Sequence, residues 1–335
     1  MKPNHPRRQF LQRAAAASLA LPFGRALAQS KPLEKISLMT SFRVFGGDAP
    51  FFVGREKGYF SERGIDLEIL EGTGSSNTAK VVAARSAHVG EVDGGVVIRS
   101  IAEGLPIKVV AGYTQSSPLC IIVPKKLGIS TPKGLEGKRI GGAAGAAGEL
   151  LFPAWLKKNG ADPDRVQLVS LQAAARNATL VQGQVDGIVG FSNGDLLIIR
   201  DRGVDAMPIM YSDFGFNVPN ICLVMNTSVI QSRPDIVRGV VAAWQRSVME
   251  TERDIKAAVD IMVSRGPKHL NPNVEVGAVR ETLKLLQTPR TKGKPYGWMA
   301  QEDWEDAINL MAEYVGLKTK PRVDDVMTNE FVPAR

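Results

Sequence analysis

The chain has 335 residues, of which 44% are hydrophobic and 23% charged, as in a globular protein long enough for two domains. Its formal net charge is +8, but Lys2, Arg7, Arg8, Arg13 and Arg25 all precede the first acidic residue. Without residues 1–28 the net charge falls to +3. This net charge gives no reason to expect nucleic acid or an anionic membrane as a partner.

Residues 1–28 have the pattern of an export signal. Arg7-Arg8 provides a charged start, residues 14–23 are apolar, and Ala26-Leu27-Ala28 is a small-x-small cleavage site. The paired arginines resemble a twin-arginine signal, with general export as the alternative route and a disordered basic tail as the alternative to export. We expect cleavage near Ala28 and a periplasmic protein. No later segment is apolar over the ~20 residues that a membrane helix needs.

The next segment alternates between strands and helices. Pro50 suits the first turn of a helix and Gly58 its end, and Ile65, Leu67 and Ile69 alternate as in a strand. These features predict an α/β lobe whose ligand-binding loops follow the carboxyl ends of its strands. In chain order, we expect strands at 36–39, 65–70, 87–92 and 107–111, and helices at 50–60, 78–85 and 96–103.

A second lobe is predicted to repeat this order. Its strands are expected at 119–123, 166–171 and 185–189, and its helices at 149–158 and 173–182. Two similar apolar segments, 118–123 and 219–224, lie on either side of it. They indicate two crossings between the lobes, and therefore a hinge.

The remaining residues are predicted to form helices that pack on the first lobe. We expect these helices at 236–262, 274–286 and 301–314. The predicted organisation is then a first lobe of residues 33–117 and 227–335, and a second lobe of residues 118–226 that includes both hinge strands.

Two glycine-rich segments could bind a ligand through their backbone. Residues 72–76 and 142–148 place N–H groups near the start of a helix, where phosphate, sulfonate, carboxylate or amide oxygens bind. A plain glycine-rich turn is the equally good alternative in both cases. Residues 142–148 lack the spacing of a Walker loop and of a dinucleotide fingerprint.

Acidic and aromatic residues occur in several predicted loops. Asp48 and Asp93 could accept hydrogen bonds from a ligand amine or ring N–H, or could be solvated or turn-forming acids. Loop phenylalanines could stack on a flat ligand or pack beneath the loops. These phenylalanines are Phe42, Phe45, Phe191, Phe214 and Phe216.

The sequence shows no arrangement typical of catalysis. His5, His88 and His269 are the only histidines, and no histidine is spaced with a nucleophile or as a zinc ligand. We therefore expect no catalytic residue, cofactor or metal. Cys120 and Cys222 lie on the two hinge strands and are expected to be separately buried thiols, with a disulfide as the alternative.

Four ordered motifs resemble a known family. APFFVGREKGYF at 49–60, followed by RGIDLE at 63–68, is similar to the opening signature of the nitrate/sulfonate/thiamine-pyrimidine group of periplasmic solute-binding proteins. The later motifs are GI at 128–129 with LEGKRIG at 135–141, GQVDG at 183–187, and TNEF at 328–331. The likeness covers nearly the whole chain after the signal.

The resemblance implies a two-lobed periplasmic binding protein of type II, a monomer that binds its ligand by lobe closure. It would deliver a small polar organic solute to an ABC permease and its ATPase in the inner membrane. A planar, pyrimidine-like or aromatic solute is favoured, and a sulfonate or taurine-like solute is the alternative. By analogy, the ligand contacts would be Phe42, Asp48, Ser75, Ser76, Asp93, Gln115, Ser116, Gly145, Ala146, Phe191, Asn193, Phe214 and Asn217.

Two other functions are compatible with the same fold. One is a ligand sensor that signals to a membrane receptor. The other is an enzyme resembling this fold that makes the thiamine pyrimidine with a cysteine-rich motif. Because this chain has two cysteines far apart and an export signal, the enzymatic function is disfavoured.

Overall fold

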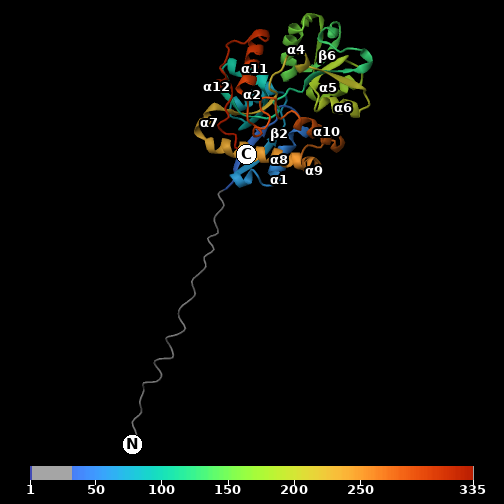
Figure 1. The fold of residues 1–335 in the computed structure, drawn as a ribbon. Coiled ribbons are helices and arrows are strands. Elements are labelled where there is room, and N and C mark those ends of the chain that lie inside the picture. The colour runs from blue at the N-terminus through green and yellow to red at the C-terminus, as the bar shows by residue number, and fades with distance from the viewer. Residues whose placement is uncertain (2–31, 335) are drawn as a thin grey trace. The chain divides into compact units, whose positions relative to one another are not determined.

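The computed structural model describes residue 1 and residues 32–334, so the predicted export signal lies outside the described residues (Figure 1). From Leu33 onward the fold is α/β, as predicted, and it contains two five-stranded sheets with helices packed against them. Within residues 32–334, no helix combines the length and apolarity needed to cross a membrane.

The first sheet has the strand order β2-β1-β3-β10-β4. β1 is parallel to both β2 and β3, whereas β10 is antiparallel to β3 and β4. The strands span β1 (Glu34–Met39), β2 (Ile65–Leu70), β3 (Val89–Asp93), β4 (Ile107–Gly112) and β10 (Ile221–Asn226).

The second sheet has the order β7-β6-β8-β5-β9 and the same pattern of directions. β6 is parallel to β7 and β8, and β5 is antiparallel to β8 and β9. Its strands are β5 (Leu119–Pro124), β6 (Arg139–Ala143), β7 (Gln167–Leu171), β8 (Gly187–Phe191) and β9 (Ala206–Met210). The expected repetition of one strand arrangement is therefore present.

β5 and β10 occupy the same position in their respective sheets. Cys120 of β5 lies opposite Gly190, and Cys222 of β10 lies opposite Val92. Both thiols are buried and free, as expected. β10 belongs to the first sheet, although the sequence grouped it with the second lobe. The lobe boundaries themselves stay a prediction.

Twelve helices of the described residues connect and cover the sheets, and short 3-10 helices lie between them. Figure 1 shows α4, α5 and α6 around β6, and α1, α8 and α9 beside β2. The helices are α1 (Ala49–Glu56), α2 (Ser75–Ala83), α3 (Gly94–Ala102), α4 (Ala147–Lys158), α5 (Arg176–Val181), α6 (Asp195–Asp201), α7 (Thr227–Ser232), α8 (Pro234–Arg253), α9 (Ile255–Arg265), α10 (Pro272–Leu283), α11 (Gln301–Tyr314) and α12 (Val323–Val326).

The structure adds β6, β9, α6, α7 and α12 to the predicted elements and divides one predicted helix. The helix expected at 236–262 is broken at Asp254, whose carboxylate accepts a hydrogen bond from the Ala257 N–H at 2.9 Å and caps α9. β9 was not predicted, because Pro208 lies inside it and proline disfavours a strand. β9 is an edge strand, which tolerates a proline.

The C-terminal helices reach further than expected. α8 packs on the first sheet, where Trp244 and Tyr113 meet edge to face with ring centroids 5.2 Å apart. α10 contacts both the 3-10 helix Gly46–Asp48 and α6, and α11 contacts both α3 and α4. These helices therefore join elements of the two sheets.

Candidate functional site

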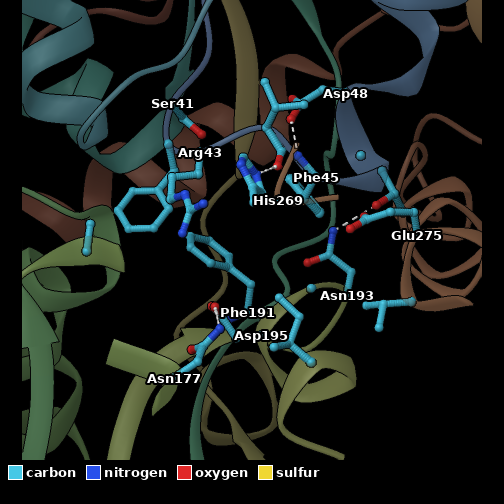
Figure 2. A pocket seen from close by; sticks show the side chains of 18 of the residues that line it. Ser41, Arg43, Phe45, Asp48, Asn177, Phe191, Asn193, Asp195, His269 and Glu275 are labelled. Carbon is cyan, nitrogen blue, oxygen red and sulfur yellow. Dashed lines mark hydrogen bonds between the residues drawn. The ribbon is translucent and has the colours of Figure 1, made fainter. Parts of the chain in front are cut away.

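A cavity of about 230 Å³ lies where loops of the first sheet face loops of the second (Figure 2). The loop after β1, residues 41–48, lines one side together with the ends of β3 and β4. Residues 173–177 and 191–195 line the side of the second sheet, and residues 269–282 complete the wall. Such a concave site between two halves of a fold is where small molecules bind.

Hydrogen bonds to distant residues fix the shape of loop 41–48. The Val44 N–H donates to Glu71 Oε1 at 2.9 Å, and the Gly46 N–H donates to Glu275 Oε2 at 2.6 Å. The Tyr113 hydroxyl donates to the Gly47 carbonyl. Gly46 is required here, because a Cβ would lie 2.6 Å from the Glu275 carbonyl oxygen.

Three carboxyl groups are buried at this side of the cavity. Asp48, Glu91 and Glu275 are 3%, 2% and 5% exposed. Burial raises the pKa of Asp48 to about 6, although hydrogen bonds with Glu91 and the Phe45 N–H oppose the rise. Burial, and then the charge of Asp48, raise the pKa of Glu91 well above its ordinary value. Burial likewise raises the pKa of Glu275 to about 7.

The opposite side contains a buried ion pair covered by an aromatic ring. Arg176, which is 2% exposed, pairs with Asp195 at 2.5 Å. Asp195 also accepts hydrogen bonds from the Asn177 amide at 2.9 Å and the Phe191 N–H at 3.0 Å. The ring of Phe42 lies 5.2 Å from the Arg176 guanidinium. The Arg176 charge is therefore already balanced within the protein.

Asn193 joins the second sheet to α10. Its side-chain N–H donates to Thr282 Oγ1 at 2.9 Å, while its Oδ1 has no hydrogen-bond partner among the described residues. Figure 2 shows the Asn193 amide at the open centre of the cavity. Asn177 Oδ1 and Arg176 Nε, in the same wall, are also buried without a partner in this part of the chain. Because such atoms are rare, they mark where a bound molecule would make hydrogen bonds.

The structure brings four of the predicted contacts together around the cavity. These are Phe42, Asp48, Phe191 and Asn193. The other nine do not line it, and their part in binding stays a prediction. They are Ser75, Ser76, Asp93, Gln115, Ser116, Gly145, Ala146, Phe214 and Asn217.

Several of these nine have evident structural roles. Asp93 caps α3 by accepting from the Gly95 N–H at 2.9 Å and also accepts from the Asn220 amide at 2.7 Å. Gln115 donates to the Leu286 carbonyl at 3.0 Å. These hydrogen bonds satisfy the polar groups without a ligand.

Ser75, Ser116 and Phe214 also have partners within the protein. Ser75 accepts a hydrogen bond from the Asp93 N–H at 3.2 Å, and the Ser116 hydroxyl donates to the Gln287 carbonyl at 3.2 Å. Phe214 packs edge to face on Trp155 with centroids 5.9 Å apart, whereas Asn217 is exposed. Of the other loop phenylalanines, Phe45 lines the cavity and Phe216 is buried in the core.

The two glycine-rich segments meet each other. The Ser76 N–H donates to the Gly145 carbonyl at 3.2 Å, and a Cβ on Gly74 would lie 2.9 Å from that same oxygen. In the structure this N–H is therefore used by the second sheet's loop.

Sequence reasoning missed several residues of the cavity. Glu91 had a usable signal, because an acid in the otherwise apolar strand β3 is unusual. Glu275 and Arg176 had none, since each lies in a helix where charged residues are common. His269, whose Nε2 lies 2.9 Å from the Val44 carbonyl, is placed there only by the tertiary fold.

Comparison with known proteins gives one family and several relatives. The model of the "NMT1/THI5 like" family matches residues 47–254. A "putative thiamine biosynthesis protein" of Haemophilus influenzae is 26% identical, over 80% of this chain and 86% of its own length. The riboflavin-binding protein RibY of Chloroflexus aurantiacus is 23% identical, over 95% of this chain and 91% of its own length. A 4-amino-5-hydroxymethyl-2-methylpyrimidine phosphate synthase of Legionella pneumophila is 23% identical, over 73% and 78%.

Solved structures share the fold at lower sequence identity. The ligand-binding component of an ABC-type import system from Staphylococcus aureus superposes with a TM-score of 0.67 at 14% identity, covering 89% of this chain and 97% of that one. The periplasmic aliphatic sulphonate binding protein SsuA of Escherichia coli gives 0.66 at 14%, covering 89% and 99%. The periplasmic binding protein fold is thus confirmed.

Proposed function

Because the chain belongs to the NMT1/THI5-like family, we propose that it is the substrate-binding component of an ABC importer. It captures a small polar organic solute outside the inner membrane and delivers it to the permease and its ATPase. The observation that carries this proposal is the cavity between the two sheets, whose walls combine aromatic rings with buried polar atoms that have no partner in the described chain.

Binding proceeds by closure of the two halves around the solute. The chain passes from the first sheet to the second between β4 and β5 and returns between β9 and β10, and these two segments act as the hinge. The hydrogen bonds from Asn193 to Thr282 and from Ser76 to Gly145 join elements of the two halves. A solute that contacts both walls favours the closed state, because only that state offers all of its contacts at once.

The solute is planar and forms hydrogen bonds through its edges. Phe42 from the loop after β1 and Phe191 from the end of β8 both line the cavity and offer faces for stacking. A pyrimidine-like or aromatic compound fits this cavity, and the relative RibY is named for binding riboflavin, a flat heteroaromatic compound. A sulfonate is the alternative, since SsuA shares the fold.

The location follows from the predicted signal. Export through residues 1–28 with cleavage near Ala28 places the protein in the periplasm, where it acts as a monomer. SsuA of E. coli is named as periplasmic, which supports this location.

We favour binding over synthesis, although relatives include pyrimidine phosphate synthases. The two cysteines are buried in different sheets, so they form no cysteine-rich motif. Within the described residues, no group of three or more histidine, cysteine or acidic side chains is arranged to hold a metal ion. A ligand sensor with the same fold is the alternative class. Adjacent permease and ATPase genes would favour transport, and an adjacent sensor-kinase gene would favour sensing.

A thermal-melt screen tests the proposal. The panel contains pyrimidines, flavins, aromatic acids and sulfonates. A ligand at 100 times its dissociation constant should stabilise the protein by roughly 2.7 kcal/mol. Absence of a shift with every compound would remove the main support for solute capture. Production of a pyrimidine by the purified protein would contradict the non-enzymatic role.

A further inference from the structure

One wall of the cavity has an excess of buried negative groups. Asp48 comes from the 3-10 helix after β1, Glu91 from β3 and Glu275 from α10. None of the three has an ion-pair partner among residues 32–334, and their electrostatic neighbours are other acids. Burying a carboxylate without a cation is costly, so this wall is either protonated or neutralised by something that binds there.

The three groups act on one another electrostatically. The charge of Asp48 adds to burial in raising the pKa of Glu91 and of Glu275, and a hydrogen bond with Glu91 opposes the rise in the pKa of Asp48. Two carboxyl groups can form a hydrogen bond only if one of them holds a proton. A cation placed against the wall would replace that proton.

A second, independent feature of the cavity also favours a hydrogen-bond donor on the solute. Asn193 is 3% exposed, and its Oδ1 is a buried acceptor without a partner in the described part of the chain. Figure 2 shows it on the same side of the cavity as Glu275 and across from Phe191. This amide belongs to the second sheet, so both halves of the protein offer unsatisfied acceptors to the solute.

Charged and titratable groups around this wall do not neutralise it. Arg176 is balanced by Asp195 at 2.5 Å. Arg43 is drawn beside Phe191 in Figure 2, away from Glu275. Arg202 and Asp201 also line the cavity, but both are exposed to solvent. The other titratable neighbours are Glu71, Tyr113 and His269, of which His269 lies 3.7 Å from Glu71 Oε1.

We infer that the solute carries a cationic nitrogen group with several N–H donors, which lies against Asp48, Glu91 and Glu275 and donates to Asn193. The inference rests on the proposed function, because it specifies the ligand of the same cavity. On binding, the N–H groups bond to the carboxylates and the displaced carboxyl proton leaves to water, so no covalent bond of the solute changes. An amidinium or a protonated amino-heterocycle has the required donors, whereas a sulfonate would meet repulsion.

Three probes of the same size test the inference directly. Benzamidinium, benzamide and benzenesulfonate share one ring and differ in charge, and titration calorimetry at pH 8 and pH 5 compares their affinities. We expect benzamidinium to bind at least tenfold more tightly than the other two at pH 8, and at least tenfold more weakly at pH 5 than at pH 8. The heat should also depend on the ionisation enthalpy of the buffer, because protons are released. Preference for benzamide or benzenesulfonate, equal affinities at both pH values, or no binding by benzamidinium would each overturn the inference.

Single-residue variants test whether the wall formed by Asp48, Glu91 and Glu275 causes the preference for benzamidinium. Glu91→Gln keeps the shape of the side chain and should weaken benzamidinium binding at least tenfold, with benzamide unchanged. Glu275→Gln serves as the second variant if Glu91→Gln fails to fold, since its amide oxygen can still accept from the Gly46 N–H. Glu149→Gln is the matched control, because Glu149 is a partly buried acid that does not line the cavity. A similar loss in Glu149→Gln would overturn the assignment.

Different results would overturn the inference and the proposed function. If the panel yields a tight ligand that is neutral or anionic, solute capture stands and the inference is wrong. If no compound of the panel binds and benzamidinium alone does, the acid wall is confirmed and the physiological role is what needs revision.

Discussion

Loops of the two sheets meet at two places that are built in opposite ways. Near Gly74 and Gly145, backbone meets backbone, with a hydrogen bond from Ser76 to Gly145 and no room for a side chain. At the cavity, large side chains such as Phe45 and Phe191 line the space between the loops. The glycine contact depends only on whether the halves are closed and does not distinguish one solute from another. The cavity walls, with their charges and rings, determine which solute is enclosed.

The largest expected effect comes from breaking the ion pair of the cavity wall. Arg176→Ala leaves Asp195 buried without a cation, which should lower the free energy of unfolding by about 3–5 kcal/mol. Arg265→Ala is the control, because its ion pair with Glu56 is exposed and should be worth under about 1 kcal/mol. Urea unfolding measures both. Equal losses would show that the wall is not held by this pair.

The wall formed by Asp48, Glu91 and Glu275 should make the free energy of unfolding depend on pH. Because the pKa of Glu275 is raised to about 7 in the folded protein, the folded state binds more protons than the unfolded state between about pH 5 and pH 7. Stability should therefore fall as pH rises through this range, by roughly 1.4 kcal/mol per pH unit for each extra proton. Urea unfolding of Glu275→Gln across this range should give a shallower slope. An unchanged slope would contradict the burial of an ionisable Glu275.

The glycine contact can be broken without touching the cavity. Gly74 has φ +147°, and a Cβ there would lie 2.9 Å from the Gly145 carbonyl oxygen. Gly74→Ala should cost about 1–3 kcal/mol of stability through strain and should weaken the ligand found by the melt screen about tenfold, by opposing closure. Gly64→Ala is the matched control, since Gly64 also has positive φ (+75°) but no atom within 4 Å. Loss of affinity in Gly64→Ala as well would show that backbone strain, not closure, is responsible.

The smallest expected effect separates recognition from packing. Phe191→Ala removes a ring of the cavity wall and should weaken that ligand at least tenfold, or about 1.4 kcal/mol. Phe214→Ala removes a ring that packs on Trp155 outside the cavity and should lower stability with affinity unchanged. Calorimetric titration of both variants decides. Unchanged affinity in Phe191→Ala would retire the stacking proposal.

The sequence was a good guide to elements and to one loop, and a poor guide to long-range contacts. The periodic segments predicted most strands. Loop 41–48, which was expected near a ligand because it follows a parallel strand of the first sheet, lines the cavity. Residues 72–76 were predicted to offer backbone N–H groups to a ligand, and the local pattern could not show that Gly145 lies against them. Glu91 and Glu275 are far apart in sequence, and only the fold places both beside Asp48.

The central claim is that a solute binds between the two sheets, and a crystal structure of the complex with the compound giving the largest melt shift tests it most directly. The account predicts one molecule per chain, with a nitrogen group between Asp48 and Asn193 and a ring against Phe191. A ligand bound outside this cavity, or one that contacts only one of the two sheets, would contradict the account.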